Sequence, residues 1–309
     1  MIEIIGLKKS FKDKEVLNNI NLKIEDGKVF GLVGINGAGK STLLRLLCGV
    51  YKADNGSILI NGEEVYENEK VKKDIFFLPD EPYYSNNTTP LSLKDIYKVF
   101  YNLDEEKYLQ YIDLFKLPLK KSMNKFSKGM KRQVFISLAL AIKPKYLLLD
   151  EAFDGLDPLA RLTFKRALID LIDECNSTVI ISSHSLRELE DICDSYGLLD
   201  NKNISSNGSI DEALTSVHKY QIAFNEEMDQ EDFDIEFKTF TKDGRIIKVV
   251  VKEDYDEFSK LISKYNPLLI DEIPIDFEEL FIIEVESRGY LKWLDYWNII
   301  LKKELILWV

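Results

Sequence analysis

The sequence has few of the residues that build disulfide frameworks, metal clusters and membrane spans. Its 309 residues include 3 cysteines and 2 histidines. Cys48, Cys175 and Cys193 lack metal-site spacing and lie in apolar patterns, so we expect free thiols that pack in cores in a reducing cytosol. No run of about 18 apolar residues is present, which argues against a membrane-spanning helix. The first residues also lack the basic and apolar regions of a secretory leader.

Basic residues are scarce in one part of the chain. The net charge is −12, and residues 226–286 hold 19 acidic and 7 basic residues, a difference of −12. The rest of the chain therefore has equal numbers of acidic and basic residues, 34 of each. Because nucleic-acid phosphates are bound by clusters of lysine and arginine, we expect no nucleic-acid surface in this segment. A solvated acidic surface is the simpler interpretation.

The order of apolar and amphipathic segments predicts three parts. Residues 1–216 alternate strands and helices, which indicates a largely parallel α/β sheet with antiparallel strands near the N-terminus and a helical insertion at about 85–130. The predicted strands of this part are 1–7, 16–24, 29–33, 57–60, 74–78, 146–149, 178–182 and 195–199. The predicted helices are 40–48, 92–115, 128–142, 157–175 and 186–193.

The segment 217–286 is predicted to form a small, acidic α+β accessory domain. Its predicted strands are 220–224, 233–240, 245–252 and 268–275, and its predicted helices are 255–265 and 277–284. Asp243-Gly244 between two of these strands is typical of a tight hairpin turn.

The tail 287–309 holds all three tryptophans, Trp293, Trp297 and Trp308, and its apolar residues recur at helical spacing. Basic residues outnumber acidic ones there. A basic, Trp-rich amphipathic helix suits a membrane surface or a groove on a partner protein. An ordinary helix that packs on its own domain would show the same spacing.

A glycine-rich loop between a predicted strand and a predicted helix is the clearest motif. Gly34-Ile35-Asn36-Gly37-Ala38-Gly39-Lys40-Ser41, followed by Thr42, fits the phosphate-binding P-loop pattern. Backbone N–H groups in such a loop point into one concavity, and the helix dipole adds partial positive charge. Lys40 would reach the β- and γ-phosphates, and Ser41 would hold Mg²⁺. The alternative is a glycine turn before an ordinary helix.

A second strand ends in two carboxylates. Asp150 and Glu151 follow the apolar run 146–149, and ligands of open α/β sheets bind at the carboxyl ends of strands. Asp150 would hold Mg²⁺ directly or through water, and Glu151 would orient the attacking water or accept its proton. A plain strand end is the alternative interpretation.

These motifs occur in the order and spacing of ABC-type ATPase domains, which residues 1–216 resemble. The resemblance rests on Gly34–Ser41, the segment 126–133, Asp150-Glu151, Gly155-Leu156-Asp157 and His184. It implies a P-loop NTPase fold of ABC type in which two domains close head to tail around two ATP molecules. It also implies that ATP is contacted by Phe11, Gly34, Asn36, Gly37, Ala38, Gly39, Lys40, Ser41, Thr42, Ser127, Gly129 and Asp157.

The resemblance assigns roles outside the P-loop. Ser127 and Gly129 would touch the γ-phosphate held by the opposite protomer, although Ser127 could equally be an ordinary N-cap. Asp157 would meet the other protomer's P-loop, and it is also placed to cap a helix that begins at Pro158. His184 would hydrogen-bond the γ-phosphate. Phe11 would stack on adenine, and a core phenylalanine is the alternative.

Asp80, Lys128 and Met130 depart from the family pattern, and Met130 replaces the usual glutamine of the signature segment 126–133. Asp80 stands where the family usually has glutamine, and a carboxylate can reach Mg²⁺ through water but cannot donate a hydrogen bond. The resemblance therefore gives Ser41, Asp150 and Asp80 as metal ligands, and acidic residues near position 80 resemble the ATPases of ABC-2 type exporters. Lys128 replaces a glycine. We hypothesise that it adds positive charge near the phosphates; the alternative is a solvated lysine.

Together these features predict the ATP-binding and ATP-hydrolysing subunit of a membrane exporter, at the cytoplasmic face of the membrane. The expected partners are a separate transmembrane permease, a second copy of the chain or a paralogous subunit, and the membrane surface through the C-terminal helix. One alternative is a soluble ABC-type ATPase that acts on ribosomes or nucleic acid. Another is a module that holds ATP without turnover, against which Glu151 and His184 argue. Import stays open, and the sequence does not identify the cargo.

Overall fold

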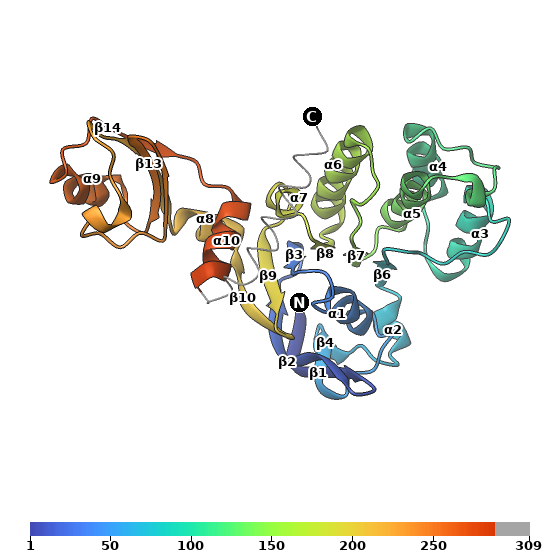
Figure 1. The fold of residues 1–309 in the computed structure, drawn as a ribbon. Coiled ribbons are helices and arrows are strands. Elements are labelled where there is room, and N and C mark those ends of the chain that lie inside the picture. The colour runs from blue at the N-terminus through green and yellow to red at the C-terminus, as the bar shows by residue number, and fades with distance from the viewer. Residues whose placement is uncertain (288–309) are drawn as a thin grey trace. The chain divides into compact units, whose positions relative to one another are not determined.

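The computed structural model describes residues 1–287, which fall into two compact units. The first spans Met1–Ser209 and the second begins at Ile210 (Figure 1). Each unit has its own sheets and is described by itself. The predicted Trp-rich tail lies outside the described residues from position 288 onward.

A small antiparallel sheet opens the first unit. Its strands, in spatial order, are β2 (Lys14–Ile24), β1 (Ile2–Phe11), β4 (Asn55–Ile60) and β5 (Glu63–Glu64). Apolar side chains on one face of this sheet, such as Ile2, Leu22 and Ile58, are buried. They share one core with Leu148 and Ile180 of the larger sheet.

The larger sheet of the first unit has six strands and carries the nucleotide-binding motifs. In spatial order they are β10 (Asn203–Ser209), β9 (Ser195–Asp200), β3 (Val29–Val33), β8 (Thr178–Ser183), β7 (Tyr146–Asp150) and β6 (Ile75–Leu78). All neighbours are parallel except β10, which runs antiparallel to β9. Strands β3, β7 and β8 are buried throughout, as expected for parallel strands covered on both faces. Their carboxyl ends meet at one edge of the sheet.

Helices of the first unit lie on both faces of this sheet, with α1 on one side and α6 on the other, whereas α3 and α4 pack on α5 (Figure 1). They are α1 (Lys40–Leu47), α2 (Glu69–Lys72), α3 (Pro90–Phe100), α4 (Glu105–Leu114), α5 (Lys128–Ile142), α6 (Pro158–Cys175) and α7 (Leu186–Glu190), with a short 3₁₀ turn at Met123–Lys125. The leucines of α1 pack in the core that joins the two sheets.

The structure corrects three predictions in this unit. The single helix predicted over 92–115 is two helices, because the Asp104 side chain accepts a hydrogen bond from the Lys107 amide and caps a new helix. The helix predicted over 186–193 ends at Glu190, ahead of the turn into β9. Strand β10 was not predicted, because its polar sequence lacks the apolar alternation of a half-buried strand.

The second unit is a four-stranded antiparallel sheet with helices. Its elements are α8 (Ile210–Thr215), β11 (His218–Ala223), a 3₁₀ turn at Gln230–Asp232, β12 (Thr239–Asp243), β13 (Ile246–Val251), α9 (Tyr255–Ser263), β14 (Leu269–Ile273) and α10 (Phe277–Ser287). The strand order is β12-β13-β11-β14. Tyr220 of β11 stacks on Phe258 of α9, with ring centroids 4.5 Å apart.

The segment predicted as a strand over 233–240 is mostly not a strand. The strand β12 begins only at Thr239. Phe233 and Phe237 are instead buried in an aromatic cluster, with the Phe233 ring centroid 4.8 Å from that of Tyr265. The predicted hairpin is confirmed, but its turn lies one residue later than the predicted Asp243-Gly244. Asp243 is still paired with Ile246, and the turn residues are Gly244, with a φ of +57°, and Arg245.

Candidate functional site

The loop between β3 and α1 forms the floor of the candidate site. Gly39 occupies the N-cap position of α1 and has a φ of +114°, a backbone conformation that residues with a Cβ rarely adopt. A Cβ on Gly34 would lie 2.6 Å from the carbonyl oxygen of Leu199. Since Gly39 has no side chain to cap α1, the first amides of the helix remain available to an anion.

Lys40 is the cation of this loop. Its side chain is 6% exposed, and Nζ donates a 2.6 Å hydrogen bond to the carbonyl oxygen of Gly34. Nζ also lies 3.4 Å from Oε1 of Glu151. A buried ammonium is therefore held at the helix N-terminus between the loop and the carboxylate of Glu151, the residue that follows β7.

Asp150 ends β7 and meets two hydroxyl groups. Oδ1 accepts hydrogen bonds from Ser41 Oγ at 3.0 Å and from Ser182 Oγ at 2.7 Å. Oδ2 is buried and has no hydrogen-bond partner among the residues that the structure describes. Buried polar atoms are normally paired, and carboxylate and hydroxyl oxygens are ligands that Mg²⁺ prefers. The donor set at Ser41 and Asp150 therefore fits a magnesium ion.

Glu151 lies between two nitrogen-bearing side chains. Its Oε2 is 2.8 Å from Nδ1 of His184 and accepts a 3.3 Å hydrogen bond from the His184 amide. Its Oε1 faces Lys40, and its side chain is 14% exposed. The backbone of Glu151 has a φ of +50°, in the left-handed region that disfavours residues other than glycine, and such strain often accompanies functional sites. Together with Asp154 and His184, Glu151 forms a group whose ligand atoms lie within 4.8 Å of one another.

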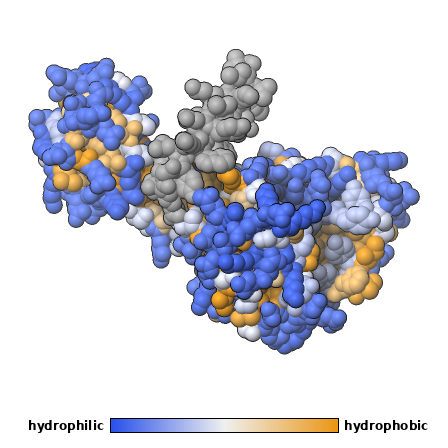
Figure 2. Space-filling view, turned by 60° about the horizontal axis from the view of Figure 1, so that its bottom comes forward, coloured by the Kyte–Doolittle hydropathy of each residue, from blue (hydrophilic) through white to orange (hydrophobic). Residues whose placement is uncertain are grey.

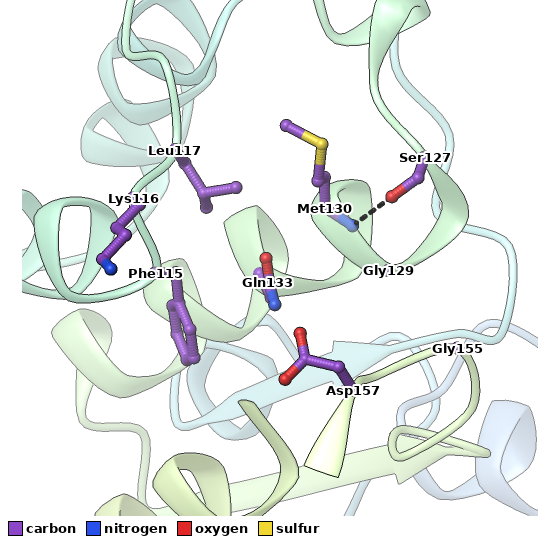
Figure 3. Close-up of a pocket in the computed structure, with 9 residues that line it drawn as sticks. All are labelled: Phe115, Lys116, Leu117, Ser127, Gly129, Met130, Gln133, Gly155 and Asp157. Carbon is purple, nitrogen blue, oxygen red and sulfur yellow. Dashed lines mark hydrogen bonds between the residues drawn. The ribbon is translucent and has the colours of Figure 1, made fainter. Parts of the chain in front are cut away.

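The first turn of α5 lies beside the loop that precedes α6. Ser127 caps α5, and its Oγ accepts a 3.1 Å hydrogen bond from the Met130 amide (Figure 3). Gly129 is in such close contact with Gly155 that a Cβ on Gly129 would overlap the Gly155 carbonyl oxygen. Asp157 caps α6, since its Oδ1 accepts hydrogen bonds of 3.0 Å from the amides of Leu159 and Ala160. Both capping interpretations are confirmed.

These two segments border a cavity of about 400 Å³. Figure 3 shows Met130 and Gln133 of α5 and Asp157 of the facing loop around it. Phe115 and Leu117 contribute apolar surface. The cavity brings together Ser127 and Gly129, which are expected to touch the nucleotide held by an opposite protomer, and Asp157, which is expected to meet that protomer's P-loop.

The remaining predicted residues occupy separate places. Phe11 is 40% exposed and not a core residue; its ring centroid lies 5.2 Å from that of Tyr51. Asp80 lies after β6, and its carboxylate is paired with Lys128 and Arg132. The ammonium of Lys128 therefore contacts acidic residues of its own chain.

Sequence reasoning missed two residues of the site, Ser182 and Arg132. Ser182 is the penultimate residue of the buried strand β8, and its hydroxyl group donates a hydrogen bond to Asp150. Arg132 is 2% exposed and donates hydrogen bonds to Asp80 and to the carbonyl oxygens of Asp150 and Glu151. Its only sequence signal was a charge two positions before a helical run, residues 134–142, that is apolar except for Ser137.

Comparison with known proteins identifies the family. A family model described as ABC transporter matches residues 17–154. The ABC transporter ATP-binding protein YtrB of Bacillus subtilis is 29% identical over 93% of this chain and 99% of its own length. The lantibiotic transport ATP-binding protein SrtF of Streptococcus pyogenes is 34% identical over 64% of this chain and 86% of its own. The methionine import ATP-binding protein MetN of Clostridium tetani is 35% identical over 68% of this chain and 70% of its own.

A solved structure of an ATP-binding subunit of an ABC transporter is also similar. It has 28% sequence identity and a TM-score of 0.64, and the alignment covers 69% of this chain and 91% of that one. The chain therefore belongs to the ATP-binding proteins of ABC transporters, and it is an ATPase with the P-loop fold of that family. Within residues 1–287, no helix combines the length and the apolar character needed to cross a membrane.

Proposed function

We propose that this chain hydrolyses ATP to power a membrane exporter, and that two ATP-binding subunits close over the nucleotide. The observation that carries this proposal is the group of charged side chains at the P-loop. Lys40 and His184 contact the two oxygens of the Glu151 carboxylate, next to Asp150, whose Oδ2 has no hydrogen-bond partner within residues 1–287. This arrangement supplies a phosphate-binding cation, a base and a metal ligand in one place.

Each of these side chains has a separate role in phosphoryl transfer. Lys40 and the first amides of α1 bind the phosphates, and Glu151 orients a water molecule for in-line attack. His184 stabilises charge on the transferred phosphoryl group. Ser41 and Asp150 would hold Mg²⁺, which when bound neutralises charge on the phosphate oxygens. Phe11 is exposed at the surface, where its ring is available to stack on adenine.

ATP binding has to displace one contact of the structure. The Glu151 carboxylate lies 3.4 Å from Lys40, in the place where phosphate oxygens would be bound. A triphosphate carries more negative charge than one carboxylate and competes for the same ammonium. Once displaced, Glu151 keeps its contact with His184 and is free to meet the attacking water.

A second subunit supplies the rest of the nucleotide contacts in this proposal. The cavity at Ser127, Gly129 and Asp157 presents a hydroxyl group and a helix N-terminus, which suit a γ-phosphate. The partner is a second copy of the chain or a paralogous subunit. Closure would bring each P-loop to the other subunit's cavity.

A separate permease would dock on the helical insertion. Most of the visible surface is hydrophilic, with apolar residues in separate patches (Figure 2). Helix α3 exposes Ile96, Val99 and Phe100, of which Val99 is 77% and Phe100 70% exposed. An exposed apolar helix face of this kind is typical of a binding surface for another protein.

Export is supported by the acidic residue at position 80, whereas the methionine import relative is the argument for uptake. In this proposal the chain lies at the cytoplasmic face of the membrane. The Trp-rich tail 287–309 contributes a membrane contact, inferred from its sequence alone.

The test is a gentle-detergent purification of the tagged full chain from its native membranes, with bound partners identified by mass. Stoichiometric recovery of a polytopic membrane protein is expected, and transport into inside-out vesicles would establish export. Uptake in the opposite orientation would contradict the direction proposed. Recovery with ribosomes or DNA and without a membrane protein would contradict the transporter assignment.

A further inference from the structure

A buried arginine joins the ends of two neighbouring strands. The guanidinium of Arg132 donates hydrogen bonds of 2.6 Å from Nη2 to both the backbone oxygen and Oδ1 of Asp80, which follows β6. Its Nη1 donates to the carbonyl oxygens of Asp150, at 3.3 Å, and of Glu151 at the end of β7. One side chain that is 2% exposed therefore contacts four oxygens from three residues.

The counter-ion of this arginine is Asp80. A guanidinium stays protonated in proteins, so its burial requires a compensating charge. Burial alone would raise the pKa of Asp80, but hydrogen bonds from Arg132 and Lys128 outweigh it and hold the pKa of Asp80 below its ordinary value. Lys128 is the weaker of these two partners, since it is 55% exposed and 3.3 Å from Oδ1.

The contact with Glu151 is the part that bears on chemistry. Glu151 has a φ of +50°, which a residue with a Cβ adopts only when its surroundings hold it there. Its amide donates to the Ser182 carbonyl oxygen at 3.1 Å. Its carbonyl oxygen accepts from Arg132 and also from the Asp154 amide, at 3.1 Å. The peptide groups on both sides of Glu151 are thus fixed, and with them the direction of its side chain.

We propose that Arg132 is a positioning residue for Glu151, and that Asp80 acts as the counter-ion of Arg132 and not as a ligand of Mg²⁺. The inference rests on the hydrolytic role of Glu151 proposed above. Because Arg132 belongs to the same helix as Ser127 and Gly129, it also fixes the first turn of α5 relative to the carboxyl end of β7. A charge removed at either end of the Asp80–Arg132 pair would loosen Glu151 without touching the phosphate-binding loop.

The test compares Arg132→Met, Arg132→Lys and Asp80→Asn in the full chain, with Lys131→Met as the matched control. Lys131 precedes Arg132 in α5, and its ammonium lies over the ring of Tyr84, 5.7 Å from the centroid. We expect Arg132→Met to lower kcat by about 10²-fold, the effect of misplacing a catalytic group by roughly an ångström. The affinity for ATP and the Mg²⁺ concentration for half-maximal rate should stay at the wild-type values. Arg132→Lys should recover only part of kcat, because an ammonium cannot reproduce the planar fork.

The Mg²⁺ titration separates the two roles of Asp80. If Asp80 is the counter-ion of Arg132, Asp80→Asn lowers kcat and leaves the Mg²⁺ concentration for half-maximal rate unchanged. The Asp80→Asn/Arg132→Met double variant is then no slower than Arg132→Met alone. A higher Mg²⁺ midpoint for Asp80→Asn would overturn the proposal in favour of a metal ligand. Wild-type kcat in Arg132→Met, or equal losses of kcat and ATP affinity, would overturn the positioning role.

Hydrogen exchange provides a measurement that does not depend on turnover. The Asp154 amide is bonded to the same carbonyl oxygen that Arg132 contacts, so its exchange should be faster in Arg132→Met than in Lys131→Met. If the wild-type chain failed to hydrolyse ATP, the proposed function would fail, and faster exchange would still support the positioning contact. Unchanged exchange in Arg132→Met would overturn it.

Discussion

At the scale of single residues, the site is a set of carboxylates, each given a different environment by its neighbours. Asp150 is bound by two hydroxyl groups, Glu151 by an ammonium and an imidazole, and Asp80 by a guanidinium. We propose that the same functional group serves here as a metal ligand, a base and a counter-ion. The three proposed roles rest on which nitrogen or hydroxyl group each carboxylate contacts.

The first prediction concerns Glu151→Gln. Loss of the base should lower ATP hydrolysis by about 10²–10⁴-fold. ATP should bind at least as tightly as before, because the variant no longer places a negative charge 3.4 Å from Lys40. Steady-state hydrolysis and equilibrium binding of a fluorescent ATP analogue measure the two effects. Asp173→Asn, at an exposed position of α6, is the control, and a hydrolysis rate close to wild type in Glu151→Gln would refute the role.

The second prediction concerns pH and Asp80. A carboxylate whose pKa is lower in the folded than in the unfolded protein stabilises the fold above its unfolded pKa. Since hydrogen bonds to Arg132 and Lys128 lower the pKa of Asp80 against the effect of burial, this contribution is present at neutral pH and is lost as the pH falls through the folded pKa, below about 3.9.

The difference in unfolding free energy between wild type and Asp80→Asn should therefore shrink as the pH is lowered from about 6 to about 3. Urea unfolding at a series of pH values measures it. A difference for Asp80→Asn that is constant across this range would count against the ion pair.

At the scale of elements, the parallel strands were predicted most closely, and the reason is their burial. The strand predicted over 29–33 has those bounds in the structure, and those predicted over 146–149 and 178–182 are one residue longer. Continuous apolar runs identify them. The break between α3 and α4 was missed because the amphipathic pattern continues across it, and only the cap at Asp104 marks it.

Contacts between elements were beyond what the sequence could predict. The sequence placed the P-loop and the Asp150-Glu151 pair at strand ends, and the structure brings Lys40 to Glu151 and Ser41 to Asp150. The contacts of Arg132 depend on how α5 packs against β6 and β7. No local pattern encodes that packing.

The third prediction tests the cap that separates the two helices. Asp104 Oδ1 accepts a 3.0 Å hydrogen bond from the Lys107 amide at the start of α4. Asp104→Ala should lower the free energy of unfolding by about 1 kcal/mol, the usual effect of removing an N-cap. Asp113→Ala, near the other end of the same helix, should have a smaller effect. The free energy of unfolding of both variants is measured by chemical denaturation. Equal decreases in the two variants would show that the cap has no special role.

At the scale of the whole molecule, the chain divides into a nucleotide-binding unit and an acidic unit with separate cores. The charge count assigned the acidity to the C-terminal segment, and the change of strand pattern indicated a second fold. What the sequence could not predict is the internal packing of that unit. Phe233 and Phe237, which alternate as strand residues do, pack as an aromatic cluster instead.

The fourth prediction concerns assembly of two subunits. In a Glu151→Gln background, ATP should shift the full chain from monomer to dimer in sedimentation experiments. Ser127→Asp should prevent the shift, because its charge repels the γ-phosphate of the opposite subunit while aspartate still caps α5.

Ser127→Asn keeps the cap without the charge and is the matched control. It should dimerise far better than Ser127→Asp, and ATP binding to isolated subunits should be the same in both. Dimerisation of Ser127→Asp at the wild-type ATP concentration would argue that this serine does not face the partner's nucleotide.

The contact between Gly129 and Gly155 has a consequence for how sequence variation at this place is interpreted. A Cβ at position 129 would overlap the backbone of the neighbouring loop, whereas the side chain of Lys128, one residue earlier, is largely exposed. In a library of random substitutions selected only for a folded protein, the selected variants would already have glycine at position 129, whereas many different residues would be found at position 128. Invariance at the glycine would then record the proximity of two backbones, before any selection for nucleotide binding begins.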